Sequence, residues 1–73
     1  MTSPLLAARL VRADQTRTFH IRRAEPSGWE IAEDEDGRVV KRKHQGDWHR
    51  VERTLARYLR AITDLREQGW REA

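Results

Sequence analysis

The feature that most constrains this chain is a stripe of apolar side chains at helical spacing through its last third. The stripe, at steps of three and four residues, is Trp48, Val51, Leu55, Tyr58, Leu59, Ile62 and Leu65. Such spacing lines one face of an α-helix, which must be buried against another layer. Asp47 precedes the stripe as an N-cap, and Gly69 follows it with the conformational freedom to end a helix. The pattern predicts a helix over residues 48–68, with Trp70 folded back onto Leu65.

The segments before this helix are typical of β-strands, because β-branched and aromatic residues alternate with polar ones. The predicted strands cover residues 16–23, 29–34 and 38–44. A five-residue loop with Pro and Gly joins the first two and sets Ile21 opposite Ile31. An acidic turn over 34–37, ending in Gly37, joins the last two. Short connections of this kind predict an antiparallel meander.

Charge pairing suggests a register for the second hairpin. If Glu33 pairs with Arg38, then Ile31 faces Val40, and Lys41 points to the opposite face of the sheet. Cross-strand pairs of opposite charge or of apolar residues stabilise neighbouring strands. The sheet face that the helix covers is then expected to carry Phe19, Ile21, Trp29, Ile31 and Val40.

The predicted fold class is α+β, with three or four antiparallel strands and one long C-terminal amphipathic helix packed on one face. Residues 1–73 are expected to form a single small domain. Residues 1–14 allow an outer strand, a helix beginning at Ser3-Pro4, or a flexible arm. We favour a strand over 6–12 that turns at 13–15, because Ala8 and Leu10 alternate with charged or exposed positions.

Composition narrows the class of protein. Hydrophobic and charged residues each make up 37% of the chain, and 15 basic residues face 12 acidic ones, which favours folding over disorder. The chain has no cysteine, which rules out disulfides and thiolate metal sites. No apolar run approaches the ~20 residues of a membrane span, and the start does not resemble a signal peptide. We therefore expect a cytoplasmic protein that is not bound to a membrane.

Few residues point to catalysis or to a metal. Ser3 and Ser27 are the only serines, and neither stands in a nucleophile motif. A single core filled by a sheet and a helix also leaves no room for a ligand cleft of ~300 Å³ or more. His44, Asp47 and His49 lie close in sequence, but a helix cap with two exposed imidazoles is the better interpretation. We expect no enzyme, no metal, no cofactor and no small-molecule substrate.

The leading functional hypothesis is an interaction domain that forms a homodimer. A helix of about six turns is longer than a three-stranded sheet of ~20 Å can cover. Its far half would leave apolar surface in water, and exposed apolar patches mark interfaces. The expected interface residues are Tyr58, Leu59, Ile62, Leu65 and Trp70. An extra strand from residues 5–11 is the alternative cover for this surface.

The second hypothesis is a nucleic-acid-binding domain. Its candidate residues are a stripe of arginines on the helix and basic positions on the sheet, namely Arg22, Lys41, Lys43, Arg50, Arg53, Arg57 and Arg60. Against it, acidic residues such as Glu30 and Asp64 interrupt both surfaces, whereas a footprint for nucleic acid is a cleaner basic patch. The excess of Arg over Lys is also typical of a GC-rich, bacterial-type genome. The sequence therefore ranks self-association first.

Overall fold

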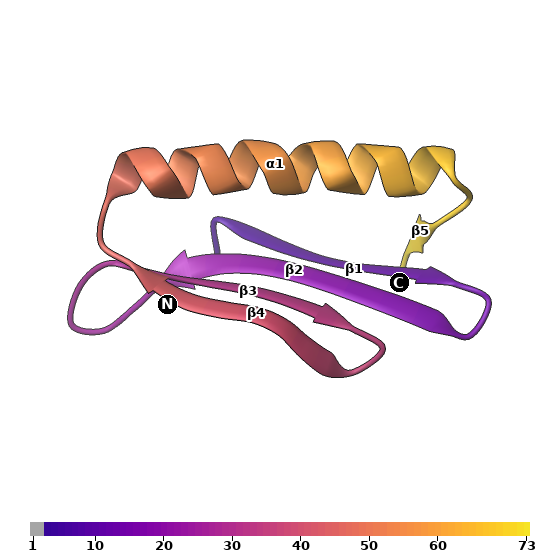
Figure 1. Cartoon of the computed structure of the whole chain (residues 1–73), viewed down its shortest axis with the longest axis horizontal. Coiled ribbons are helices and arrows are strands. Elements are labelled where there is room, and N and C mark those ends of the chain that lie inside the picture. Colours follow the sequence, from indigo (N-terminus) through magenta and orange to yellow (C-terminus); the bar gives the residue numbers. More distant parts are fainter. Residues whose placement is uncertain (1–2) are drawn as a thin grey trace.

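The computed structural model describes residues 3–73 and places one long helix along one face of an antiparallel sheet (Figure 1). The elements are β1 (Leu6–Arg12), β2 (Gln15–Arg23), β3 (Trp29–Glu35), β4 (Arg38–Gln45), α1 (Trp48–Glu67) and β5 (Arg71–Glu72). The strand order is β4-β3-β2-β1-β5. The predicted α+β class is confirmed, with five strands in the sheet instead of three or four and a helix of 20 residues.

Strand β1 resolves the ambiguity at the start of the chain. It pairs antiparallel with β2 through a tight turn in which Ala13 takes a φ of 55°. Leu10 in this strand is fully buried. The strand that the sequence favoured is therefore confirmed, while residues 1–2 lie outside the described part of the chain. Strand β5 was not predicted; its two residues pair with Leu10 and Val11 at the outer edge of β1.

Both ends of α1 follow the predicted capping chemistry. The Asp47 carboxylate accepts a hydrogen bond of 2.9 Å from the backbone N–H two residues later. At the other end, Gly69 has a φ of 97°, and the Trp70 N–H donates to the Leu65 carbonyl at 3.0 Å. This 6→1 bond defines a Schellman cap. The helix ends one residue earlier than predicted, and the cap directs the chain back toward β1, where β5 forms.

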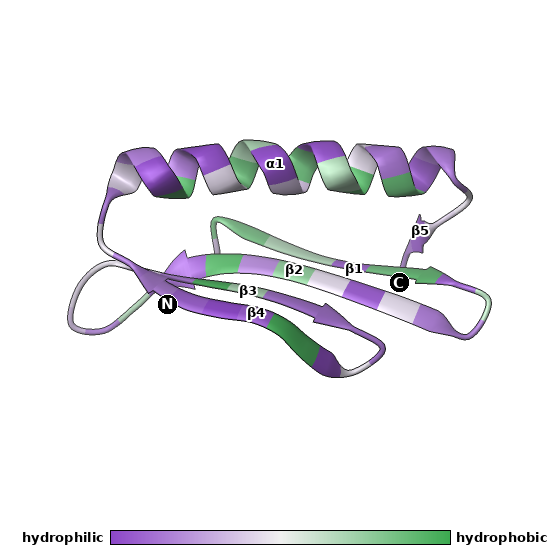
Figure 2. Cartoon of the chain, viewed as in Figure 1, coloured by the Kyte–Doolittle hydropathy of each residue, from purple (hydrophilic) through white to green (hydrophobic). Residues whose placement is uncertain are grey.

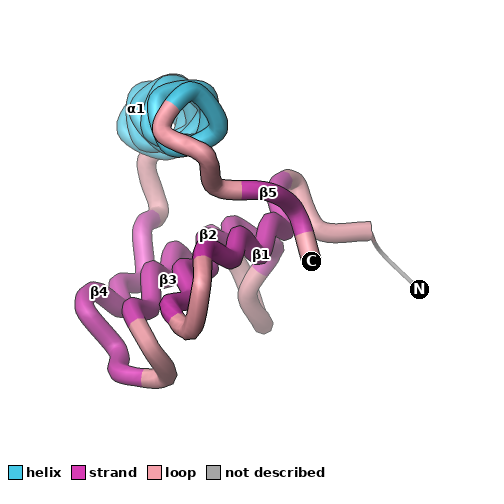
Figure 3. The backbone as a smooth tube through the Cα atoms, turned by 90° about the vertical axis from the view of Figure 1, so that its right-hand side faces the viewer, coloured by secondary structure: helices cyan, strands magenta, loops and turns pink. Residues whose placement is uncertain are grey.

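One cluster of buried side chains lies between α1 and the sheet, and Figure 3 shows the helix above one sheet face. Its members are Leu10, Phe19, Ile21, Ile31, Val51, Tyr58, Ile62, Leu65 and Trp70. The predicted Ile21–Ile31 pair is confirmed. The expectation that the far half of α1 outruns the sheet is wrong. The four main strands are seven to nine residues long, and β1 widens the sheet beneath the helix.

The turn between β3 and β4 is shorter than predicted. Asp36 and Gly37 alone form it, with φ angles of 51° and 81°. Two consecutive residues with positive φ are typical of the type I′ turn that matches the twist of a hairpin. Arg38 therefore pairs with Glu35 and not with Glu33, so the register that was predicted from charge pairing is wrong.

A β-bulge follows this turn and shifts the register again. Asp34 pairs with Val39, whereas Glu33 pairs with Lys41, which makes Val40 the extra residue of the bulge. Val40 was predicted for the core but is 52% exposed. Figure 2 shows this apolar segment of β4 near the turn, on the free edge of the sheet.

Candidate functional site

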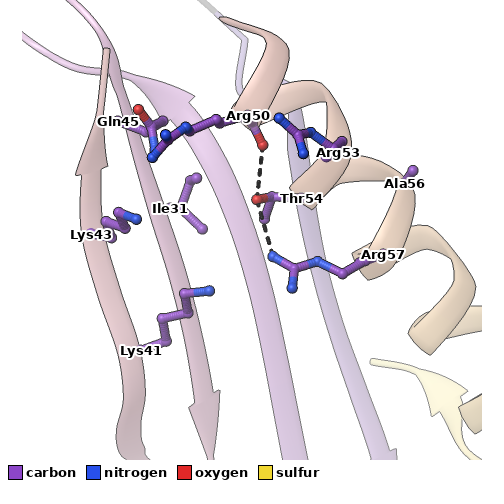
Figure 4. Close-up of a pocket in the computed structure, with 9 residues that line it drawn as sticks. All are labelled: Ile31, Lys41, Lys43, Gln45, Arg50, Arg53, Thr54, Ala56 and Arg57. Carbon is purple, nitrogen blue, oxygen red and sulfur yellow. Dashed lines mark hydrogen bonds between the residues drawn. The ribbon is translucent and has the colours of Figure 1, made fainter. Parts of the chain in front are cut away.

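A groove of about 490 Å³ lies between α1 and the β3–β4 edge of the sheet (Figure 4). It is lined by Ile31, Lys41, Lys43, Gln45, Arg50, Arg53, Thr54, Ala56 and Arg57. In the view of Figure 4, Arg50 and Arg57 extend from the helix toward the strands, and Lys41 extends from β4 toward the helix. The expectation that the core leaves no room for a cleft is wrong. Strand β4 contributes no member to the buried apolar cluster, so the space between it and α1 is not packed.

The bulge decides which β4 side chains line this groove. Directly paired residues share a face of the sheet, and beyond the bulge Ile31 pairs with Lys43. Ile31 is 1% exposed beneath the helix, so Lys43 lies on the helix side. Lys41, two residues earlier, lies on the same side by strand alternation. The prediction that Lys41 faces away from the helix is wrong, because the extra residue Val40 reverses the alternation.

The groove gathers positive charge. Of the residues in the described part of the chain that line it, five are cationic and none is acidic. Arg50 is within reach of a carboxylate, with its Nε 3.8 Å from Asp47 Oδ2, while Arg57 donates to Thr54 Oγ1 at 3.4 Å. The groove cations that form no ion pair within residues 3–73 are Lys41, Lys43, Arg53 and Arg57. Gathered like charges repel one another, and a bound anion would relieve that repulsion.

Five of the seven residues that the sequence nominated for nucleic acid line this groove, and two do not. Arg60 is exposed and lies about one helical turn beyond Arg57, so it continues the same side of α1. Arg22 is a separate feature, because its guanidinium donates to Glu30 Oε1 at 2.9 Å. His20 Nε2 lies 3.3 Å from the same oxygen. The hydrogen bonds from His20 and Arg22 hold the pKa of Glu30 below its ordinary value.

Four lining residues, namely Ile31, Gln45, Thr54 and Ala56, were not singled out from the sequence as part of a site. Gln45 continues the two-residue alternation of Lys41 and Lys43 along β4. Thr54 lies between the arginines on the helix and is buried, with its hydroxyl donating to the Arg50 carbonyl at 3.0 Å. Alternation along β4 would have found Gln45, but only after the position of the bulge was known.

Four of the five predicted interface residues, namely Tyr58, Ile62, Leu65 and Trp70, are buried in the core of the chain itself. Leu59 is different, because it is 48% exposed. Leu55, one turn earlier on the same flank of α1, is partly buried. The two flanks of the helix therefore differ: one borders the basic groove, and the other presents apolar side chains.

The histidines at the β4–α1 junction make separate contacts. His44 Nε2 lies 2.9 Å from the Ser27 carbonyl, Asp47 caps the helix, and the His49 side chain is exposed. Within residues 3–73, no group of three His, Asp or Glu side chains is arranged to hold a metal ion. None of the helices in that range is long and apolar enough to cross a membrane.

Comparison of the chain with protein-family models, with curated proteins and with solved structures gave no match. Its function is therefore argued from its own residues.

Proposed function

We propose that this protein binds nucleic acid and that the groove between α1 and β4 holds the phosphate backbone. The observation that carries the proposal is the convergence of five cations from two elements on one groove without an acidic neighbour among the lining residues. Phosphate contacts from Lys and Arg supply most of the affinity of nucleic-acid-binding proteins. Basic residues that alternate with acidic ones along the sequence are thus brought together on one groove.

The extent of the basic surface favours a polymer over a small anion. From Arg50 to Arg60 the basic side of α1 spans ten residues, which corresponds to about 15 Å. Lys41 and Lys43 add a second row of charge on the opposite wall. At one end the Gln45 side-chain oxygen accepts from the Asp47 N–H at 3.1 Å, which leaves the side-chain NH2 group as a donor for a base or a sugar.

The proposal is tested by measuring the affinity for labelled oligonucleotides by fluorescence anisotropy at several salt concentrations. With about five phosphate contacts, log K should fall against log salt with a slope of roughly −3.5 for a single strand or −4.5 for a duplex. Lys43→Gln and Arg53→Gln should each weaken binding and reduce the slope by about one. Arg22→Gln is the matched control, because it removes the same charge from a residue outside the groove.

Two results would contradict the groove as the binding site. The first is an affinity that does not depend on salt or on Lys43 and Arg53. The second is an equal loss for Arg22→Gln, which would assign binding to the net charge of +3 and not to a site. Polyglutamate that competes as well as an oligonucleotide would indicate an acidic protein partner in place of nucleic acid.

Self-association is a second candidate function, and the exposure of Leu59 favours it. If the apolar flank of α1 packs antiparallel against a second copy about a two-fold axis, Leu55 of each copy faces Leu59 of the other. The contact occurs twice by symmetry and covers apolar surface that is otherwise in water. The basic groove lies on the other flank and stays open in such a dimer.

Light scattering at high micromolar concentration tests this second proposal. The wild type should have the mass of a dimer, and Leu59→Glu should be monomeric because a charge in the contact is costly to desolvate. Arg53→Glu, which changes the groove, should remain dimeric. A monomeric wild type would refute the dimer and leave the groove proposal intact.

A further inference from the structure

A pair of tryptophans lies where α1 begins. The rings of Trp29 and Trp48 are 5.2 Å apart and tilted by 42°, and the Arg23 guanidinium lies 5.1 Å from the Trp29 ring. Trp29 is partly buried between these neighbours, whereas Trp48 is 42% exposed. Exposure of so much of the Trp48 ring to water is unfavourable, and a flat aromatic partner stacked on the ring would remove that surface from water.

This pair lies beside one end of the basic groove. Trp29 is the direct cross-strand neighbour of Gln45, which lines the groove. Trp48 and Arg50 are two residues apart on α1 and so point to different sides of the helix, and Trp48 approaches the groove only through its contact with Trp29. An exposed aromatic surface therefore lies next to Gln45, at one end of the groove.

The charges on the helix disfavour a duplex. To enter a major groove, α1 would have to present the side that points away from the sheet. That side carries the exposed residues Glu52, Asp64 and Glu67 next to its basic ones, and their carboxylates would repel phosphates. The groove cations instead face one another across a groove of about 490 Å³, a volume typical of small-molecule pockets. A groove of that size can hold part of a single strand but not a duplex.

We infer that the nucleic acid bound here is single-stranded, with its backbone along the groove cations and a base stacked on Trp48. The inference rests on the proposed nucleic-acid function. Single-strand-binding proteins combine a basic groove with aromatic side chains in this way, and the stacking tolerates any base because every base has a π-face. Ile31 closes the floor of the groove but is only 1% exposed, so the contacts with the strand come from the groove cations and from Trp48.

The experiment compares a 12-nucleotide single strand with a duplex of the same sequence, by anisotropy and by tryptophan emission. The wild type should bind the single strand at least about tenfold more tightly, and emission should fall as a base stacks. Trp48→Phe keeps a ring and should retain most of the affinity. Trp48→Leu keeps apolar bulk without a ring and should lose roughly five- to a hundredfold.

The outcomes separate this inference from the function on which it rests. Equal or tighter binding of the duplex would overturn single-strand selectivity while leaving nucleic-acid binding in place. Equal affinities for Trp48→Phe and Trp48→Leu, with both proteins folded by circular dichroism, would overturn stacking on Trp48. Salt-insensitive or undetectable binding of both oligonucleotides would refute the proposed function itself.

Discussion

The hydroxyl of Tyr58 is a buried polar group whose removal should stabilise the protein. Tyr58 is 6% exposed and packs its ring against Phe19, with ring centroids 5.1 Å apart. Its hydroxyl oxygen has no hydrogen-bond partner among residues 3–73. A buried polar group without a partner costs about 1–3 kcal/mol, while the aromatic contact is the same for Phe. We expect Tyr58→Phe to raise the free energy of unfolding by ~1 kcal/mol, or Tm by about 4–8 °C for a domain of this size.

The same environment predicts how stability changes at alkaline pH. Burial raises the pKa of Tyr58, and the negative charge of Glu33 adds to this shift. Above the unfolded pKa of about 10, the unfolded chain loses a proton that the folded chain keeps. Ionisation of Tyr58 therefore leaves the free energy of unfolding unchanged below pH ~10 and lowers it as pH rises toward the folded pKa. Tyr58→Phe should lack this part of the alkaline loss.

Urea unfolding at pH 7 and above pH 10 measures both effects in the wild type and in Tyr58→Phe. Because Tyr58 is the only tyrosine of the chain, the absorbance of tyrosinate during alkaline titration reports its pKa directly. A Tyr58→Phe protein that is less stable than the wild type at pH 7 by more than ~1 kcal/mol would refute the argument, since the hydroxyl would then make a favourable hydrogen bond. Titration of the folded protein at an ordinary tyrosine pKa would refute the burial argument.

Three further predictions concern the fold. Gly69→Val should lower the free energy of unfolding by about 1 kcal/mol or more, because the φ of 97° disfavours a β-branched residue although an added Cβ meets no atom closer than 3.9 Å. Ile31→Ala should cost about 2–5 kcal/mol and partly exposed Leu55→Ala clearly less, and equal losses in urea unfolding would contradict the burial of these side chains. Deletion of Val40 should leave Ile31 opposite Lys43, because it removes only the extra residue of the bulge and keeps the pairs on either side of it; cross-strand proton contacts in NMR spectra test this.

The parts of the fold that the sequence predicts are those with local signals. The helix is marked by its period and by Asp47 and Gly69 at its ends, and these groups act within one or two turns of the chain. The β2–β3 register follows from the length of one loop. Strand β5 has two residues and no pattern of its own. It forms because the Schellman cap turns the chain toward the free edge of β1, which is a property of the assembled sheet.

The predicted β3–β4 register is wrong because it was based on surface charge pairs, which constrain a hairpin less than the type of its turn does. Charge pairs on a surface contribute at most about 1 kcal/mol, and Glu33 finds a partner in either register. In the structure its carboxylate accepts from Arg17 on β2 at 2.9 Å. Asp36 and Gly37 form a two-residue turn of the preferred hairpin type, and that turn places Glu35 opposite the first residue of β4.

The bulge also explains why the candidate cations form one groove. The register predicted from the sequence placed Lys41 on the sheet face away from the helix arginines, whereas the structure places it beside them. In a hairpin without the bulge, Val40 would pair with Glu33 beneath the helix, and Lys41 would face away. With it, β4 leaves Val40 in water and directs Lys41 and Lys43 toward α1. This arrangement leaves Val40 exposed and gathers like charges, although Lys41 also lies directly opposite Glu33. Departures from the rule that apolar side chains are buried and charged ones exposed are concentrated at functional sites, and bulges commonly redirect side chains at such sites. The bulge therefore supports the groove as the site that β4 is shaped to build.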